Sequence, residues 1–170
     1  TKLIDFNVVL NQLEEFEYKS FKDLFVEFLS RPEWREFNPT IVCLSALFSP
    51  SYDSVLNIAQ CCRDIFPQSF ILAGGFLPTN TYKQMFRDGP AFDALCYGEG
   101  EKALARFVNA ADKRLHLEED PTWITRKKVE ERRRFTFDFI TDLDELPFLD
   151  YKISDMRGYS LNPTMSAYPA

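Results

Sequence analysis

The sequence predicts an α/β domain with a doubly wound, mainly parallel sheet, and two observations lead to this fold class. Short apolar runs, typical of strands buried on both faces, alternate with segments whose apolar residues recur at helical spacing. Small or polar residues follow where these runs end. In open α/β sheets the ligand crevice lies outside the carboxyl ends of the strands, so the pattern also predicts where a ligand would bind.

The central β-α-β unit is predicted in residues 40–75. Residues 41–47 are almost continuously apolar and read as a buried strand, and Pro50 suits the first turn of the helix that follows. One apolar helix face is then formed by Val55, Ile58, Ala59, Cys62, Ile65 and Phe66. The helix ends at Pro67, and a second strand over residues 70–73 stops at two glycines.

Further elements are predicted on both sides of this unit. Residues 2–10 read as a strand beside 41–47, and Ser20 with Asp23 resembles a capping box before a helix. After the second strand, a loop over 76–80 leads to a short helix capped by Thr79 or Asn80. A third strand over 93–97 then turns into a helix that begins near Glu101. These repeated crossings define a flavodoxin-like (Rossmann-like) sheet.

The pattern changes near residue 112. Residues 121–125 and 134–139 are predicted as the two strands of a β-hairpin around a charged turn, 126–133. Residues 140–170 contain few helical signals and several prolines, so they read as an extended arm or linker. We therefore expect a domain over 1–112, a hairpin extension over 113–139 and a linker over 140–170.

Composition narrows the class of protein. A hydrophobic content of 45% and 17 phenylalanines supply a real core, which argues against disorder. The net charge of −6 disfavours non-specific binding to nucleic acid, and the basic residues of 126–133 are best interpreted as a solvated tip. Without a signal peptide or a membrane-spanning run, a cytoplasmic location is expected. The four cysteines, Cys43, Cys61, Cys62 and Cys96, lack metal-site spacing and read as reduced structural thiols. Cys43 and Cys96 fall inside apolar strands and are expected to be buried.

Several short motifs resemble known cofactor-binding proteins. Ser45-Ala46-Leu47 followed by Gly74-Gly75 resembles the S-x-L … G-G half of the cobalamin-binding pattern of methionine synthase and corrinoid-dependent mutases. The third element of that pattern, D-x-H-x-x-G, is absent. The chain also resembles the N-terminal domain of B12-binding radical SAM proteins over roughly residues 3–151. The motifs shared with that family are Thr79 after the glycines, the G-E-G-E of residues 98–101 and the D-L-D-x-L-P of residues 142–147.

The resemblance implies that the nucleotide tail of cobalamin binds at the carboxyl ends of the strands. The residues implied as cofactor contacts are Ser45, Leu47, Ser49, Gly74, Gly75, Thr79, Tyr97, Gly98 and Glu99. The alternative is that the paired glycines only make a tight turn and that Ser45 is a satisfied core residue. Residues 98–101 either lie beside the cofactor or simply cap a helix, and Glu99 and Glu101 would repel a phosphate there.

The only histidine, His116, lies in a charged stretch and is expected on the surface. The resemblance then implies base-off cobalamin without a histidine ligand. It further implies a module of a larger radical SAM enzyme that performs methyl transfer or related radical chemistry on a small-molecule or unknown substrate. S-adenosylmethionine and a [4Fe-4S] cluster would bind to a radical SAM domain outside these residues. By comparison with that family, the first β-α element is missing, and these residues alone would not be catalytic. The alternative is the same fold used without cobalamin, as a structural or substrate-docking domain.

Overall fold

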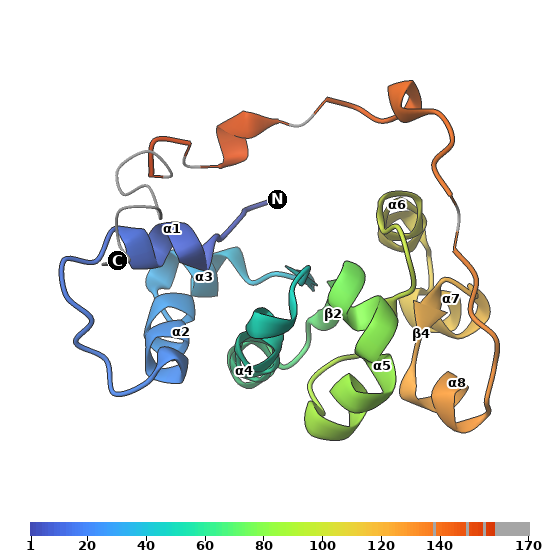
Figure 1. The fold of residues 1–170 in the computed structure, drawn as a ribbon, viewed down its shortest axis with the longest axis horizontal. Helices are drawn as coiled ribbons and strands as arrows, with labels where there is room; N and C mark the ends of the chain where they lie inside the picture. The colour runs from blue at the N-terminus through green and yellow to red at the C-terminus, as the bar shows by residue number, and fades with distance from the viewer. Residues whose placement is uncertain (138, 149, 155, 159–170) are drawn as a thin grey trace, which may run out of the picture. The chain divides into compact units, whose positions relative to one another are not determined.

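The computed structural model describes residues 1–137, 139–148, 150–154 and 156–158 (Figure 1). The chain forms two compact units, one of residues 19–140 and the other of residues 1–18 together with 141–170. The larger unit holds the sheet and the residues that line its cavity. Its elements are α2 (Phe21–Leu29), α3 (Pro32–Phe37), β1 (Ile41–Ser45), η1 (Ser49–Ser51), α4 (Tyr52–Ile65), β2 (Phe70–Gly74), α5 (Phe76–Asp88), β3 (Ala94–Cys96), α6 (Glu101–Asn109), α7 (Lys113–Glu119), β4 (Trp123–Ile124) and α8 (Arg126–Glu130).

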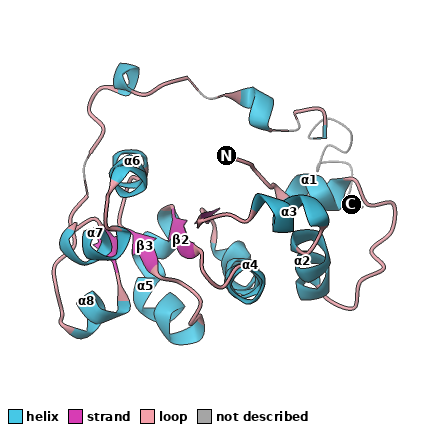
Figure 2. Cartoon of the chain, turned by 180° about the vertical axis from the view of Figure 1, so that it is seen from behind, coloured by secondary structure: helices cyan, strands magenta, loops and turns pink. Residues whose placement is uncertain are grey.

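The sheet has four strands in the order β1-β2-β3-β4. Strands β1, β2 and β3 are parallel, with Ile41 opposite Phe70 and Leu72 opposite Ala94. Strand β4 pairs antiparallel with β3. Helices α4 and α5 lie on one side of the sheet and α6 on the other (Figures 1 and 2). The predicted α/β class with a mainly parallel sheet is therefore confirmed.

Alternation along the strands divides the core between the two faces of the sheet. Ile71, Leu95 and Ile124 are 0% exposed and point to the side of α4 and α5. The residues between them point to the other side and form a cluster with α6 and α7. This cluster consists of Leu72, Ala94, Cys96, Ala103, Phe107, Leu117 and Trp123. The continuous apolar character of the strands thus has its expected cause, burial on both faces.

Local polar contacts fix the ends of these elements. The Ser20 hydroxyl accepts a hydrogen bond from the Asp23 N–H at 3.2 Å, so the predicted cap of α2 is confirmed. Arg63 on α4 pairs with Asp93 at 2.6 Å, and the same carboxylate accepts the Ile71 N–H at 2.7 Å. One ion pair therefore ties a helix, a strand and the loop before β3 together.

The strand predicted over residues 2–10 is wrong. The structure places helix α1 at Phe6–Asn11, because Asp5 acts as its N-cap and accepts the Asn7 N–H at 2.8 Å. Among the described residues, β1 therefore has a strand partner only on its β2 side. The expectation that residues 41–47 lie between two strands is also wrong, and β1 is an edge of the sheet as far as the structure describes it.

The β-hairpin predicted over 121–139 is wrong as well. Thr125 ends β4 and caps α8 by accepting the Lys128 N–H at 3.3 Å, so the charged stretch begins as a helix. Lys128 is 2% exposed, and its ammonium donates to the carbonyls of Asp120 and Trp123 at 2.8 and 3.0 Å. Strand β4 pairs with β3 instead of with residues 134–137 or 139. A buried lysine that binds the carbonyls of the segment just before it is a feature that the hydrophobic pattern does not contain.

One smaller expectation also changes. Residues 76–80 are helical rather than a loop, since α5 begins at Phe76 and bends at Thr81 (φ −121°). The charged stretch after Asp112 forms α7, because the Asp112 side chain accepts the Leu115 N–H at 2.9 Å.

The described part of residues 141–158 contains two short 3-10 helices, η2 (Leu143–Glu145) and η3 (Tyr151–Ile153). The arm or linker predicted over residues 140–170 stays a prediction, and its residues 159–170 lie outside the described residues. Over the part of the chain that the structure describes, every helix is too short or too polar to cross a membrane.

Candidate functional site

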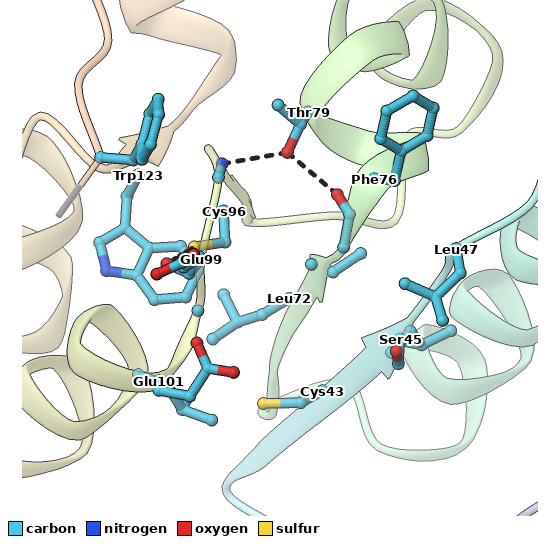
Figure 3. Close-up of a pocket in the computed structure, with 18 residues that line it drawn as sticks. Cys43, Ser45, Leu47, Leu72, Phe76, Thr79, Cys96, Glu99, Glu101 and Trp123 are labelled. Carbon is cyan, nitrogen blue, oxygen red and sulfur yellow. Dashed lines mark hydrogen bonds between the residues drawn. The ribbon is translucent and has the colours of Figure 1, made fainter. Parts of the chain in front are cut away.

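A cavity of about 640 Å³ opens at the carboxyl ends of β1, β2 and β3, within the larger unit (Figure 3). Its size is typical of pockets that hold small molecules or cofactors. It lies where the ligand crevice of an open α/β sheet is expected. Its lining residues are Cys43, Leu44, Ser45, Leu47, Leu72, Ala73, Gly74, Gly75, Phe76, Thr79, Cys96, Gly98, Glu99, Gly100, Glu101, Leu104, Trp123 and Phe137.

Most of the residues predicted as cofactor contacts meet in this cavity. Ser45, Leu47, Gly74, Gly75, Thr79, Gly98 and Glu99 all line it. Ser49 and Tyr97 do not: Ser49 begins η1, and the Tyr97 ring packs against Phe135 and Phe137. The structure therefore brings seven of the nine predicted residues to one place, and their role as cofactor contacts stays a prediction.

Two of the lining glycines are required by the backbone. Gly75 has φ +106° and Gly98 has φ +81°, which is a region that side chains rarely tolerate. A Cβ on Gly75 would lie 2.6 Å from the Ala46 carbonyl oxygen, which accepts the Leu77 N–H at 3.1 Å. Gly75 thus serves the close approach of the loops after β1 and β2.

Two other lining glycines are not required in this way. The φ angles of Gly74 and Gly100 lie outside the left-handed region. A Cβ on Gly74 would meet only the Cys96 Cβ at 3.6 Å, and one on Gly100 only the Cys96 Sγ at 3.9 Å. Neither contact is tight. The missing side chains at Gly74 and Gly100 therefore leave space on both sides of Cys96, in the wall of the cavity.

Thr79 joins the loops after β2 and β3 across the cavity. Its hydroxyl donates to the Gly75 carbonyl at 3.0 Å and accepts the Gly98 N–H at 3.0 Å (Figure 3). Sequence reasoning placed Thr79 at the site but gave it the role of a helix cap. In the structure its hydroxyl instead fixes the separation of two backbone segments that line the cavity.

The polar character of the lining is modest. Glu99 and Glu101 carry its formal charges, and none of the lining residues is lysine or arginine. Burial raises the pKa of the Cys96 thiol to about 12, so this thiol stays protonated at neutral pH. The remaining walls are mostly aliphatic or aromatic. The cavity is therefore suited to an apolar group that enters from the side of the strand ends.

Sequence reasoning missed several lining residues. Cys43, Leu72 and Cys96 lie two residues before Ser45, Gly74 and Gly98, so the alternation of each strand would have placed them on the same face. Cys43 was expected to be buried but is exposed, because its strand lies at the edge of the described sheet. For Phe137, far away in the sequence, no local pattern indicated a place at the site.

His116 lies away from the cavity and is not the solvated surface residue that was predicted. Its side chain is 19% exposed, its Nε2 lies 3.4 Å from Asp120 Oδ2, and its ring packs on Phe107. The same carboxylate binds Arg106 at 3.0 Å. The described residues contain no group of three histidine, cysteine, aspartate or glutamate side chains arranged to hold a metal ion.

Comparisons with known proteins bear directly on this cavity. A family model described as the B12 binding domain matches residues 21–108. An uncharacterized methyltransferase of Pyrococcus horikoshii is 28% identical over 125 residues, which are 74% of this chain and 27% of that protein. An anaerobic magnesium-protoporphyrin IX monomethyl ester cyclase of Rubrivivax gelatinosus is 29% identical over 96 residues, which are 54% of this chain and 17% of that protein. No solved structure gives a significant match.

Proposed function

The chain belongs to the B12 binding domain family, and from this we propose that it binds cobalamin in the cavity at the carboxyl ends of β1–β3. The observation that carries the proposal is the space left by Gly74 and Gly100. The backbone does not require glycine at either position, yet both line the cavity beside Cys96. A slender group, such as the nucleotide tail of cobalamin, needs such a gap between strand ends and helices.

Other parts of the cavity support the same proposal. Ser45 offers a hydroxyl at the end of β1, and the Thr79 hydroxyl holds the two loops that frame the entrance. The only histidine of the chain is held by Asp120 and Phe107 away from the lining. We propose that the cofactor inserts its tail in the cavity and so binds with its own base displaced from cobalt, without a histidine ligand from these residues.

The relatives are much longer than the matched residues, so the activity of a whole protein of this kind is a separate proposal. These residues cover 27% and 17% of the lengths of the two relatives, which are named as a methyltransferase and a cyclase. We propose that the module presents cobalamin to a radical SAM domain of the same polypeptide. That domain would bind S-adenosylmethionine and an iron–sulfur cluster. Bound cobalamin would supply methyl-transfer or radical chemistry, while the residues described here bind and orient it.

A second function is a docking domain that keeps the fold without the cofactor. The exposed apolar side chains beside the cavity, Leu47, Phe48 and Phe76, favour it because a partner domain would cover them. In that case filling the cavity would leave the protein's activity intact. The two functions are therefore separated by a direct measurement of cofactor binding.

The test is the response of the full-length protein to hydroxocobalamin. A ligand at one hundred times its dissociation constant stabilises the folded state by about 2.7 kcal/mol. Each kcal/mol moves the melting temperature of a domain of this size by roughly 2–4 °C, so we expect a rise of roughly 5–10 °C. The visible spectrum of the complex should be that of a base-off corrinoid.

Substitution at Gly74 provides the matched variants. Gly74→Leu should abolish the thermal shift while the protein stays folded, because the side chain would occupy the cavity rather than the core. Gly74→Ala adds one methyl at an ordinary contact distance from Cys96 and should keep most of the shift. If the wild-type protein shows no shift at millimolar hydroxocobalamin, the docking function is the better one.

A further inference from the structure

A segment that lies outside the residues matched by the family model closes one side of the cavity. We call residues 135–137 with 139–140 the strap; residue 138 is not described. Phe135 packs edge-on against Tyr82 of α5, with ring centroids 5.6 Å apart, and also against Tyr97. Phe137 packs against Tyr97 at 5.9 Å and lines the cavity. An aromatic row therefore holds the strap against the end of β3.

The backbone of the site is shaped to receive this strap. A Cβ on Gly98 would lie 2.5 Å from both Cβ and Cγ of Phe137, so the strap passes where only glycine leaves room. The N–H of Gly98 is bound by Thr79 on the other side of the loop. The loop after β3 is thus fixed between Thr79 and Phe137. Phe137 is 45% exposed, so part of its ring faces the open cavity.

Glu99 secures the far end of the strap. Its Oε2 accepts the backbone N–H of Ile140 at 2.8 Å, and Ile140 is 8% exposed. This carboxylate was predicted as a cofactor contact. It also binds the protein's own backbone, and it lines the cavity, so that role stays a prediction. The bond turns one of the two negative charges of the lining toward the strap.

We propose that Phe137 is a wall of the cofactor site that packs on the aromatic base of a corrinoid's nucleotide tail. Glu99 is then a positioning residue that holds this wall through Ile140. The inference rests on the proposed function and deepens it. The tail is the slender part of a corrinoid, and its flat base matches an aromatic ring at the side of a mostly apolar cavity.

The charges of the lining determine which part of the tail enters. The tail also carries a phosphate, and among the described residues that line the cavity there are two carboxylates and neither lysine nor arginine. Like charges repel more strongly where water is excluded, so the phosphate stays at the solvent side and the uncharged base goes inward. We place the base beside Phe137, which lines the cavity next to Gly98.

Two corrinoids separate contact with the base from contact with the macrocycle. Hydroxocobalamin carries the nucleotide tail, whereas cobinamide has the same corrin ring and lacks the nucleotide. Dissociation constants for both are measured by absorbance titration on the full-length protein. Phe137→Ala should weaken hydroxocobalamin about tenfold, the loss expected for one aromatic packing partner, and leave cobinamide within about twofold.

Phe139→Ala is the matched control. Phe139 is the next described residue of the strap, is 66% exposed and does not line the cavity. It touches the site only through its ring contact with Phe137 at 6.1 Å, so this variant should bind both corrinoids within about twofold of the wild type. Equal losses for the two corrinoids in Phe137→Ala would mean that the ring contacts the macrocycle, and would overturn the proposal. Unchanged binding of both would overturn it as well.

The positioning role of Glu99 has its own readout. Glu99→Ala should weaken hydroxocobalamin about threefold and speed hydrogen exchange of the Ile140 amide, because that N–H loses its acceptor. Glu99→Gln keeps an acceptor oxygen and should restore slow exchange. If Ile140 exchange is the same in all three proteins, Glu99 does not hold the strap. If the wild type binds neither corrinoid, the proposed function itself fails, which is a different outcome from failure of the Phe137 variant alone.

Discussion

The two faces of the sheet differ in how completely the helices cover them. On the side of α4 and α5, Ile71, Leu95 and Ile124 are all 0% exposed. On the side of α6 and α7, Leu72 is 1% exposed, yet Cys43 two strands from β3 is open to solvent. From β2 to β4 the first face is therefore a closed core, while Val42 and Leu44 of β1 on that face are half-buried. The other face is a core toward β4 and a cavity toward β1.

Because of this difference, neighbouring residues of one strand serve different properties, one the stability of the fold and the next the binding of a ligand. Neighbouring residues of β2 point to opposite faces, so Ile71 belongs to the closed core while Leu72 borders the cavity. Substitutions on the closed face should change the free energy of unfolding. Substitutions at the open end of the other face should change ligand binding with little effect on unfolding.

The largest effect is expected from Ile71→Ala. Removing a fully buried isoleucine leaves a cavity between the sheet and its helices, which should lower the free energy of unfolding by about 2–5 kcal/mol. Leu47→Ala is the control on the open side, since Leu47 is 53% exposed at the rim of the cavity, and should cost less than about 0.5 kcal/mol. Urea denaturation measures both. A similar cost for the two variants would show that the rim is packed and that the faces do not differ as described.

A smaller effect is expected from the paired glycines. Gly75→Ala should cost about 1–3 kcal/mol, because φ is +106° and the new Cβ would lie 2.6 Å from the Ala46 carbonyl oxygen. Gly74→Ala should be neutral or stabilise by about 0.4–1 kcal/mol, since its backbone accepts a side chain. The same denaturation experiment compares them. Equal costs would contradict the assignment of Gly75 to the backbone and Gly74 to the cavity.

The structure of the central β1-α4-β2 unit could be predicted from the sequence better than that of the segments around it. Periodicity located β1, α4 and β2 because their burial follows from local alternation and helical spacing. It failed for residues 2–10, because a run of apolar residues does not show that Asp5 caps a helix by accepting the Asn7 N–H. It failed again after Thr125, because the pattern does not show that Thr125 caps α8 or that Lys128 binds the carbonyls of Asp120 and Trp123. In both places hydrogen bonds between polar side chains and nearby backbone decide the structure, and hydrophobic periodicity does not record them.

The candidate site was predictable in part for a similar reason. Ser45, Gly74 and Gly98 end consecutive strands, so topology alone brings them together. The sequence could not distinguish Gly74 from Gly75, because the two differ in φ and in the atoms around an added Cβ. Phe137 was not predictable, since it reaches the cavity through ring contacts with Tyr97 rather than through a strand.

The smallest effect on the free energy of unfolding is expected at Asp120. This residue joins α6 and α7 on the cavity side of the sheet, near β4, where that side is packed. Although burial alone would raise the pKa of Asp120, hydrogen bonds from Thr122 and Arg106 outweigh it and lower this pKa. A lowered pKa in the folded state means that the ionised carboxylate stabilises the fold. That contribution is complete above the unfolded pKa of about 3.9 and is lost as the pH falls through the lower folded value.

Asp120→Asn removes the charge and cannot titrate. It should lower the free energy of unfolding at neutral pH by about 1–2 kcal/mol. The effect is no larger because Arg106 is 39% exposed and water screens its attraction to Asp120. The difference between wild type and variant should shrink as the pH falls below about 3.9, because the wild-type carboxylate is then protonated too. Urea denaturation from pH 7 to pH 3 measures it. The comparison is repeated in a His116→Gln background, so that the imidazole 3.4 Å from Asp120 does not contribute. A difference that stays constant over this range would show that the carboxylate charge does not hold α6 and α7 together, and that their packing rests on Phe107 and its neighbours alone.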